Sequence, residues 1–289
     1  MTKRNAIIMA AGTSSRFVPL SAECPKGLIE VKGEILIERQ IRQMKEAGIN
    51  DIILVVGYKA EMFSYLKEKS GVRIVLNDDY GRYNNTSSLI RVIDELDNTF
   101  ICSSDNYFPE NVFTNDSTES YYSALYAEGE TCEYCMTVNE YGQITNVTVG
   151  GRDAWYMVGH VFFNSEFSEA FRKIMIEEYE NEETKQGYWE DVYIRYIDRL
   201  PKMNINRYMA GEIQEFDSID ELRLFDKSYI NDTRSSVVKQ ICNYLNVNEA
   251  NVYGFKNIKH KGEYLNFRFM VENIGYEYNS QNGIKIMKI

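Results

Sequence analysis

Histidine, cysteine and long apolar runs are scarce in this sequence, and each shortage disfavours a class of protein. No apolar run approaches the roughly 20 residues that span a bilayer, so we expect no transmembrane helix. Met1–Arg4 leads into an apolar run that is too short for a secretory signal peptide. Five cysteines, an odd number, suit reduced thiols better than a disulfide framework. A cytoplasmic location is therefore the expected one.

Metal or redox chemistry through cysteine is also disfavoured. Cys132 and Cys135 have the C-x-x-C spacing of zinc and redox sites, but the sequence has no second pair. Only His160 and His260 could complete a metal shell. We expect the two cysteines to be exposed residues of a strand.

Positive charge is in deficit, with a net charge of −11, which disfavours nucleic acid as a partner. The charge is unevenly spread along the chain. Residues 1–77 hold 12 basic and 8 acidic side chains, residues 78–232 hold 12 and 31, and residues 233–289 hold 8 and 4. A basic opening suits an anionic polyphosphate, whereas an acidic middle suits metal ions or a cationic co-substrate.

The most informative stretch is Ala6–Val31. It opens with a short apolar run, Ala6–Met9, which predicts a buried strand. A turn of small residues follows, and then come Arg16 and Lys26. Small residues after a strand let the backbone approach a ligand closely and leave N–H groups free for phosphate oxygens. The two cations add the charge that a polyphosphate needs, although neither common phosphate-loop pattern is present.

Strand and helix patterns alternate through the first hundred residues. We expect strands at residues 51–57, 73–76 and 99–103, and helices at residues 34–47 and 59–69. This order predicts an α/β fold with a doubly wound, mixed but mainly parallel sheet, in which ligands bind beyond the carboxyl ends of the strands. Asp105 lies just past the end of one such strand, where an acid is well placed to hold a divalent metal.

The rest of the chain changes pattern twice. Residues 121–163 alternate in the manner of four antiparallel strands, and helices are expected at residues 165–180, 188–199 and 218–227, with a strand at residues 204–208. A helix at residues 235–245 and strands at residues 252–258, 264–271 and 284–289 then predict a small C-terminal α+β appendage. No proline- or glycine-rich linker marks the join, and we place the domain boundary between residues 1–230 and 231–289.

These motifs resemble the signature of the sugar-phosphate nucleotidyltransferase family. Its pattern is an apolar strand, A-A-G, small residues, Arg, a short loop and P-K, matched here by Ala10-Ala11-Gly12, Arg16 and Pro25-Lys26. Within that family the sequence most resembles the bacterial CTP:phosphocholine cytidylyltransferases, over roughly residues 5–228. The stretches that support this are AAGTSSRF, CPKGLIEVKGE, ERQIRQMKEAGINDIILVVGY, NNTSSL, SSDNY, GYWEDV and EFDSIDEL.

The resemblance implies a Rossmann-like nucleotidyltransferase fold and a reaction of CTP with phosphocholine. A phosphate oxygen of phosphocholine would attack the α-phosphorus of CTP with the help of Mg²⁺, giving CDP-choline and pyrophosphate. Lys26 and Arg16 would neutralise the triphosphate, and Asp105 and Asp217, which each end an apolar segment, would hold the metal. The residues implied to hold the nucleotide are Ala10, Ala11, Gly12, Asn85, Thr86 and Ser87. The last three could instead only cap a helix, or do both.

Choline's trimethylammonium group calls for aromatic faces and nearby carboxylates. The residues that the resemblance places there are Tyr134, Tyr188, Trp189, Glu190 and Asp191. The family pattern has a larger aromatic near Tyr134, and many of the 22 tyrosines must simply pack. Two alternatives therefore stay open: the same chemistry on phosphoethanolamine, an aminophosphonate or a sugar 1-phosphate, and a non-catalytic nucleotide-binding regulator.

Residues 261–269, KGEYLNFRF, resemble the first hairpin of a choline-kinase-type lobe. No segment follows that could carry a kinase's catalytic Asp and Asn, so we expect no independent kinase activity. A remnant of such a lobe, a docking module and part of a longer fusion all remain open for residues 231–289.

Overall fold

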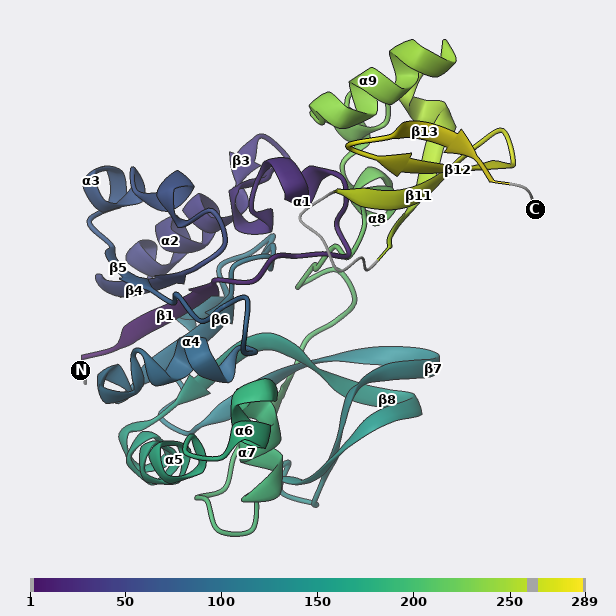
Figure 1. Ribbon diagram of the computed structural model, residues 1–289. Helices are drawn as coiled ribbons and strands as arrows, with labels where there is room; N and C mark the ends of the chain where they lie inside the picture. The colour runs from purple at the N-terminus through teal and green to yellow at the C-terminus, as the bar shows by residue number, and fades with distance from the viewer. Residues whose placement is uncertain (1–2, 259–264, 288–289) are drawn as a thin grey trace. The chain divides into compact units, whose positions relative to one another are not determined.

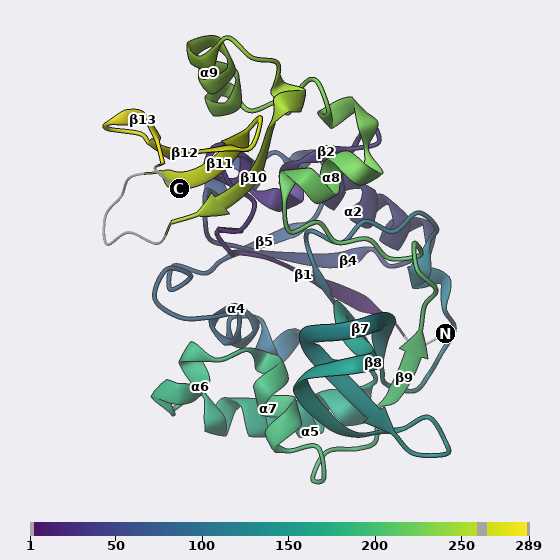
Figure 2. The ribbon, with the colours of Figure 1, turned by 90° about the vertical axis from the view of Figure 1, so that its right-hand side faces the viewer.

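A computed structural model describes residues 3–258 and 265–287 of the chain. By their contacts the residues divide into two compact units, shown in Figures 1 and 2. The first unit combines Met1–Gly12 with Leu36–Gln214, and the second combines Thr13–Ile35 with Glu215–Ile289. Each unit thus joins segments that are distant in sequence, and the domain boundary expected near residue 231 stays a prediction.

The first unit is built around a seven-stranded sheet with the order β5-β4-β1-β6-β8-β7-β9. The pairs from β5 to β6 and the pair β7–β9 are parallel, whereas β8 runs antiparallel to β6 and β7. This mixed, mainly parallel sheet confirms the predicted fold class. The strands are β1 (Asn5–Ala10), β4 (Asp51–Val56), β5 (Arg73–Leu76), β6 (Thr99–Ser103), β7 (Tyr121–Val138), β8 (Ile144–Phe163) and β9 (Asn204–Arg207).

Helices cover both faces of this sheet, as Figures 1 and 2 show. One face carries α2 (Leu36–Glu46) and α3 (Leu66–Ser70), and the other carries α4 (Thr86–Ile90) and α5 (Ser165–Glu178). Phe163 of β8, Phe167 and Phe171 of α5 and Leu89 of α4 belong to one core cluster. The remaining helices of the unit are α6 (Glu182–Gln186), α7 (Trp189–Arg195) and the 3₁₀ turns η2 (Ala60–Phe63), η3 (Ile93–Glu95) and η4 (Val112–Thr114).

The second unit begins with the segment that carries Arg16 and Lys26. This segment folds into α1 (Leu20–Glu23), η1 (Lys26–Leu28) and a short hairpin of β2 (Glu30–Val31) and β3 (Glu34–Ile35). Its C-terminal part, Glu215–Ile289, includes the α+β appendage predicted for residues 231–289, and its antiparallel sheet has the order β10-β11-β12-β13. The elements are α8 (Ile219–Phe225), η5 (Lys227–Tyr229), α9 (Ser236–Leu245), η6 (Glu249–Asn251), β10 (Val252–Asn257), β11 (Asn266–Val271), β12 (Ile274–Asn279) and β13 (Gly283–Ile286).

The structure corrects several predicted elements. The single helix expected at residues 59–69 is instead η2 followed by the short α3. The four strands expected at residues 121–163 are two long strands with several register shifts. Of the two cysteines expected to be exposed, Cys132 is exposed but Cys135 is buried. His260, residues 261–264 of the expected hairpin and residues 288–289 of the last expected strand lie outside the described residues.

Within the part of the chain that the structure describes, no helix has both the length and the apolar character needed to cross a bilayer.

Tight packing between β8 and β6 gives a test of the fold. A Cβ added to Gly159 would lie 2.2 Å from Ser103 Oγ and 2.7 Å from Ser103 Cβ. We expect Gly159→Ala to lower the free energy of unfolding by about 1–3 kcal/mol, because inserted atoms force neighbouring groups to shift. Urea denaturation followed by circular dichroism measures the change.

Gly81→Ala is the matched control, since a Cβ there would meet no atom within 4 Å. We expect it to change the free energy of unfolding by less than about 0.5 kcal/mol. Equal effects of the two substitutions would show that β6 and β8 are not packed as described.

Candidate active site

Lys26 is a buried cation with two carboxylates close to it. Its side chain is only 5% exposed, and its Nζ lies 3.9 Å from Glu215 Oε1 and 3.8 Å from Asp217 Oδ1. The same Nζ lies 5.8 Å from the centre of the Phe17 ring. An ammonium group removed from water needs anionic partners, and the two acids supply them. All four residues belong to the second unit.

Arg16 approaches Asp217 from the solvent side. Its guanidinium Nη1 donates to Asp217 Oδ2 at 2.5 Å, although the arginine side chain remains 73% exposed. The loop that presents it is fixed by Phe17, which is 2% exposed and whose N–H donates to the carbonyl of Ser14 at 2.9 Å. Sequence reasoning placed Arg16, Lys26 and Asp217 in one site, and the structure brings these three together.

Sequence reasoning missed Glu215 as a member of this group. The signal was available in the order acid, phenylalanine, acid at residues 215–217, because a buried aromatic between two acids suggests that the acids lie together on the other side. Phe216 is 3% exposed and packs at 5.2 Å against the Phe225 ring, so its two neighbours face away from that apolar contact. Glu215 and Asp217 therefore share the side on which Lys26 lies.

The carboxyl end of β1 provides backbone groups in the first unit. Ala10 and Ala11 are buried, and the carbonyl of Ala11 accepts the N–H of Tyr58 at 3.0 Å. A Cβ on Gly12 would meet no protein atom within 4 Å, and Gly12 does not need a positive φ. The space beside the Gly12 backbone is therefore open, which is compatible with close approach of a ligand.

Asp105 follows β6 in a loop whose backbone is hydrogen-bonded to a side chain of α2. Gln40 Nε2 donates to the carbonyls of Ser103 at 2.9 Å and Asn106 at 2.8 Å, the residues on either side of the Ser104-Asp105 pair. Gln40 is fully buried, whereas Asp105 is partly exposed. The loop thus has a fixed backbone and presents one carboxylate at the edge of the sheet.

Asn85, Thr86 and Ser87 make contacts inside the first unit. Asn85 is the N-cap residue of α4, but its side chain forms no capping hydrogen bond. Its Oδ1 accepts the N–H of Trp189 at 2.8 Å, and its Nδ2 donates to Glu190 Oε2 at 3.2 Å. The side-chain cap considered for Asn85 is therefore wrong, because this amide ties α4 to α7.

The two hydroxyls beside Asn85 are fully buried. Thr86 Oγ1 donates to the carbonyls of Lys185 and Gly187, both at 3.1 Å. Ser87 Oγ donates to the carbonyl of Asn84 at 2.7 Å and accepts from Asn77 Nδ2 at 2.9 Å. These bonds organise the start of α4, and a contact of either residue with a nucleotide stays a prediction.

Two tyrosines and an aspartate form a corner at the start of α7. The rings of Tyr134 and Tyr188 meet edge to face, with centroids 6.3 Å apart and planes at 81°. Tyr134 donates its hydroxyl to Asp191 Oδ1, and the N–H of Tyr188 donates to Asp191 Oδ2, both at 2.8 Å. Because Tyr188 is 45% exposed, this corner presents aromatic surface to solvent beside a negative charge.

Trp189 is more deeply buried than Tyr188, which precedes it in the chain. It is 3% exposed and contacts the rings of Tyr122, Phe163 and Phe171 at 5.9, 5.7 and 5.9 Å. Its position within the core cluster explains its size without a ligand. The structure thus groups Tyr134, Tyr188 and Asp191, and supports them with Trp189.

Glu190 carries a carboxyl group in an unusual environment. Its Oε1 accepts from the Tyr122 hydroxyl at 3.1 Å, and its Oε2 accepts from Asn85. Burial raises the pKa of Glu190 to about 7, against the effect of these hydrogen bonds, and the charge of Asp191 adds to the rise. Burial also raises the pKa of Tyr134, and so does its bond to Asp191. Negative charge at this corner is therefore costly without a nearby cation.

Carboxylate oxygens are the charged ligands that these groups offer to a hard divalent cation. No cluster of three or more His, Cys, Asp or Glu side chains arranged for a metal ion occurs among the described residues. Mg²⁺ in phosphoryl-transfer enzymes is held by one or two carboxylates together with substrate phosphates, so it does not need such a cluster. Asp105 and Asp217 each fit this hard-ligand chemistry.

Comparison with known proteins defines the class. The sequence pattern of the MobA-like NTP transferase domain matches residues 6–155. The chain therefore belongs to the MobA-like NTP transferase family and is a nucleotidyltransferase, which confirms the resemblance drawn from its motifs.

Two cytidylyltransferases are among its similar relatives. The chain is 36% identical to the choline-phosphate cytidylyltransferase of Streptococcus pneumoniae over 222 residues, 77% of this chain and 96% of the relative. It is 35% identical to the 2-aminoethylphosphonate cytidylyltransferase of Lancefieldella rimae over 232 residues, 79% of this chain and 94% of the relative. The solved structure of the CTP:phosphocholine cytidylyltransferase from Streptococcus pneumoniae superimposes with a TM-score of 0.75, covering 78% of this chain and 99% of that one.

The raised pKa of Glu190 predicts a pH-dependent stability. Between about pH 4.5 and about pH 7 the folded protein keeps a proton that the unfolded chain has released, so the free energy of unfolding falls as pH rises. Glu190→Gln removes this titration. From about pH 5 to about pH 8 we expect the variant to gain about 1–3 kcal/mol of unfolding free energy relative to wild type, at about 1.4 kcal/mol per pKa unit.

Urea denaturation at several pH values measures this difference, with Glu128→Gln, an exposed position on β7, as the control for loss of one charge. A Glu190→Gln difference that stays constant with pH would mean that this carboxyl titrates as it does in water.

Proposed function

We propose that this protein transfers the cytidylyl group of CTP to phosphocholine, giving CDP-choline and pyrophosphate. The observation that carries this proposal is the corner of Tyr134, Tyr188 and Asp191, which joins exposed aromatic surface to negative charge. A quaternary ammonium group is attracted to aromatic faces and to carboxylates. The similarity to a choline-phosphate cytidylyltransferase over most of both chains supports the same substrate pair.

The reaction needs no activated side-chain nucleophile, because the acceptor phosphate is already an anion. One of its oxygens forms a bond to the α-phosphorus of CTP, and the bond from that phosphorus to the bridging oxygen of the β-phosphate breaks. Pyrophosphate leaves with the electron pair of that bond. The work of the protein is alignment and charge stabilisation.

Lys26 and Arg16 are the cations that we assign to the triphosphate. The distances of 3.8 and 3.9 Å from Lys26 Nζ to its carboxylates exceed a hydrogen bond, so a phosphate oxygen can bind this ammonium more closely than they do. Arg16 is exposed, and an incoming phosphate can replace Asp217 as its partner. The backbone at Ala10, Ala11 and Gly12 is the proposed nucleotide contact at the end of β1.

Asp105 and Asp217 are the residues that we propose as ligands of Mg²⁺. A divalent cation bound to such carboxylates neutralises phosphate charge and orients the triphosphate. The exchange of Arg16 from Asp217 to phosphate would leave the carboxylate of Asp217 available to the metal.

The contacts at α7 favour a trimethylammonium group over a primary amine. A primary ammonium carries three N–H donors that need acceptors. Each oxygen of Asp191 accepts one bond, from Tyr134 or Tyr188, and each oxygen of Glu190 accepts one from Tyr122 or Asn85, so only one lone pair per oxygen remains for such donors. A trimethylammonium group has no N–H to satisfy and needs only charge and aromatic surface.

The alternative that a specific observation supports is 2-aminoethylphosphonate as the acceptor. The relative with this activity is nearly as similar to the chain as the choline-phosphate enzyme. The chemistry at phosphorus would be unchanged, and only the group bound beside Tyr134 and Tyr188 would differ. A cytoplasmic location fits either acceptor and stays a prediction.

Pyrophosphate release with Mg²⁺ and CTP tests the function directly. The acceptors to compare are phosphocholine, phosphoethanolamine, 2-aminoethylphosphonate and glucose 1-phosphate, and each reaction is repeated with ATP, GTP and UTP. We expect the highest kcat/KM for CTP with phosphocholine, by at least about tenfold, because one good cation–π contact contributes about 1–2 kcal/mol. Preference for 2-aminoethylphosphonate would keep the mechanism but exchange the acceptor.

Substitutions of Tyr188 provide the matched control for the acceptor. Tyr188→Ala removes the exposed ring, and Tyr188→Phe keeps it. We expect the alanine variant to raise the KM for phosphocholine about tenfold and the phenylalanine variant to leave it within about twofold. An unchanged KM in the alanine variant would remove Tyr188 from the acceptor site.

The proposed metal ligands make a separate prediction. Asp105→Asn keeps the size of the side chain but removes its charge, so we expect the Mg²⁺ concentration for half-maximal activity to rise at least about tenfold. Titration of activity with MgCl₂ measures this. Asp116→Asn, in an exposed loop of the same unit, is the control, and a titration curve shared by all three proteins would exclude Asp105 as a ligand.

A further inference from the structure

The segment that carries Lys26 is attached to the C-terminal part of the chain at points on either side of the lysine. Thr13–Ile35 clusters with Glu215–Ile289 in the second unit, and not with the sheet that precedes it in sequence. Lys26 lies in η1, after α1 and before β2. A charge-stabilising group must lie within a short distance of its substrate, and small displacements are costly. The attachments on both sides of Lys26 therefore matter, because they fix the position of its ammonium group.

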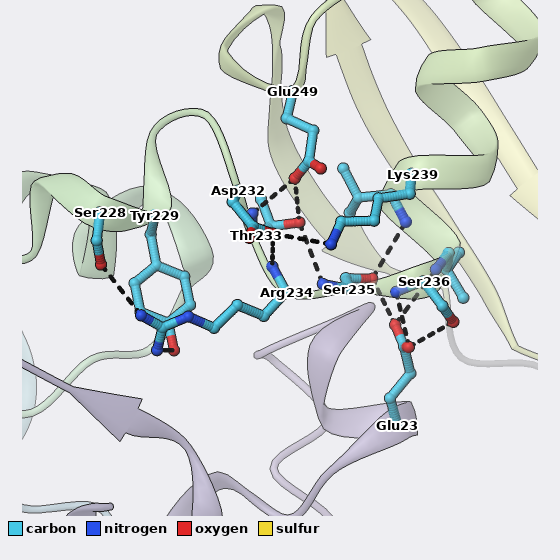
Figure 3. Close-up of polar contacts among 12 residues, drawn as sticks. Glu23, Ser228, Tyr229, Asp232, Thr233, Arg234, Ser235, Ser236, Lys239 and Glu249 are labelled. Carbon is cyan, nitrogen blue, oxygen red and sulfur yellow. Dashed lines mark hydrogen bonds and ion pairs between the residues drawn. The ribbon is translucent and has the colours of Figure 1, made fainter. Parts of the chain in front are cut away.

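The first attachment is Glu23, the last residue of α1, which binds the N-terminus of α9 (Figure 3). Its carboxylate accepts the N–H of Ser236 at 2.8 Å, the hydroxyl of Ser236 at 2.6 Å and the N–H of Val237 at 3.4 Å. It also accepts the hydroxyl of Ser235, the N-cap residue. The first turn of a helix has N–H groups without partners inside the helix and a partial positive charge, and a carboxylate satisfies both.

The protonation state of Glu23 fits this contact. Partial burial raises its pKa, but the hydrogen bonds from Ser235, Ser236 and Val237 outweigh burial, and the pKa lies below its usual value. The residue is therefore an anion at neutral pH, held against the positive end of a ten-residue helix.

The second attachment is Glu30 in β2, which Tyr229 and Arg234 hold. The Tyr229 hydroxyl donates to the carbonyl of Glu30 at 2.6 Å, and Arg234 Nη1 donates to the same carbonyl at 3.1 Å. Arg234 Nη2 also lies 3.3 Å from Glu30 Oε1. Two residues further on, the N–H of Lys32 donates to Asp226 Oδ2 at 2.7 Å.

The residues that bind Glu23 and Glu30 lie in or next to a segment that makes further contacts within the second unit. The Arg234 guanidinium lies 4.4 Å from the centre of the Tyr229 ring. Thr233 donates its N–H and its hydroxyl to Glu249 Oε2, both at 2.6 Å, and Lys239 lies 3.0 Å from Asp232 (Figure 3). The segment from Ser228 to Lys239 is therefore held at several points by polar contacts within the second unit.

We propose that Glu23 is a positioning residue for Lys26, and that α9 and the segment leading into it belong to the machinery of nucleotidyl transfer. Glu23 does not touch the substrates in this proposal. It fixes the backbone three residues before Lys26, while Glu30 fixes the backbone four residues after it. The inference rests on the proposed function, because that function gives Lys26 its role.

Replacement of Glu23 tests the proposal. We expect Glu23→Ala to lower kcat about tenfold and to weaken CTP binding, while the KM for the acceptor stays within about twofold, since the aromatic corner is in the first unit. Glu23→Gln keeps an acceptor oxygen but loses the charge, so its kcat should lie between those of wild type and Glu23→Ala. Steady-state kinetics with pyrophosphate detection and calorimetry with CTP measure these values.

Asn164→Ala is the matched control for loss of a helix cap. Asn164 Oδ1 accepts the N–H of Phe167 at 2.9 Å at the start of α5, in the first unit. We expect Asn164→Ala and Glu23→Ala to lower Tm by similar amounts, but only Glu23→Ala to lower kcat. An equal loss of kcat in both variants would make Glu23 a merely structural residue and overturn the inference.

The partner side and Lys26 itself complete the test. Ser235→Ala with Ser236→Ala should reproduce part of the Glu23→Ala defect, and adding these changes to Glu23→Ala should cost little more, because interacting residues are not additive. Lys26→Ala should lower kcat by about 10²–10³. In that background Glu23→Ala should have less than a twofold further effect, and a full tenfold effect would show that Glu23 acts through another group.

The outcomes separate this inference from the proposed function. Absence of turnover with every acceptor would overturn the function, and the CTP dissociation constants of wild type and Glu23→Ala would still decide the role of Glu23. Turnover by wild type with unchanged kcat and unchanged CTP binding in Glu23→Ala would overturn the inference alone.

Discussion

The second unit depends on one electrostatic requirement: the buried ammonium group of Lys26 needs anionic partners at all times. Glu215 and Asp217 meet this need at distances slightly too long for hydrogen bonds, and Phe17 shields the group from water on another side. Removing either acid would leave a charge buried without full compensation, which costs several kcal/mol. The same two carboxylates lie far enough from the ammonium group for a phosphate oxygen to approach it more closely than they do, so stability and phosphate recognition involve the same group.

The corner at α7 in the first unit has the opposite requirement. Glu190 and Asp191 place negative charge among aromatic rings, and the raised pKa of Glu190 records the cost. A cation bound against Tyr134 and Tyr188 would lower that cost, as phosphate lowers the cost of a buried lysine. The chain therefore contains one group that favours an anion and one that favours a cation. The first is the group proposed for the triphosphate of CTP, and the second is the group proposed for the trimethylammonium end of phosphocholine.

The sequence predicted the features that follow from local patterns. Buried strands such as Asp51–Val56 are continuous apolar runs, and the motifs assigned Arg16, Lys26 and Asp217 to one site, where the structure shows them paired. The features it failed to predict depend on contacts between distant residues. The polar motif around Trp189 gives no sign that this side chain lies in the core. Likewise, nothing near Glu23 in the sequence shows that its carboxylate will bind the N-terminus of a helix more than two hundred residues later. The pattern of residues 59–69 also gave no sign that the expected helix would divide into η2 and α3.

The discontinuity of the second unit has a consequence for synthesis on the ribosome. Glu23 and Ser235 are 212 residues apart in the chain. At about 5–20 residues per second, roughly 10–40 s pass between the appearance of the acid and that of the helix that receives it. Throughout that interval the sheet of the first unit can assemble around an unanchored loop. The sheet of the first unit can therefore form early, and the lysine-bearing loop gains its anchor at Glu23 only after Ser235 has been synthesised.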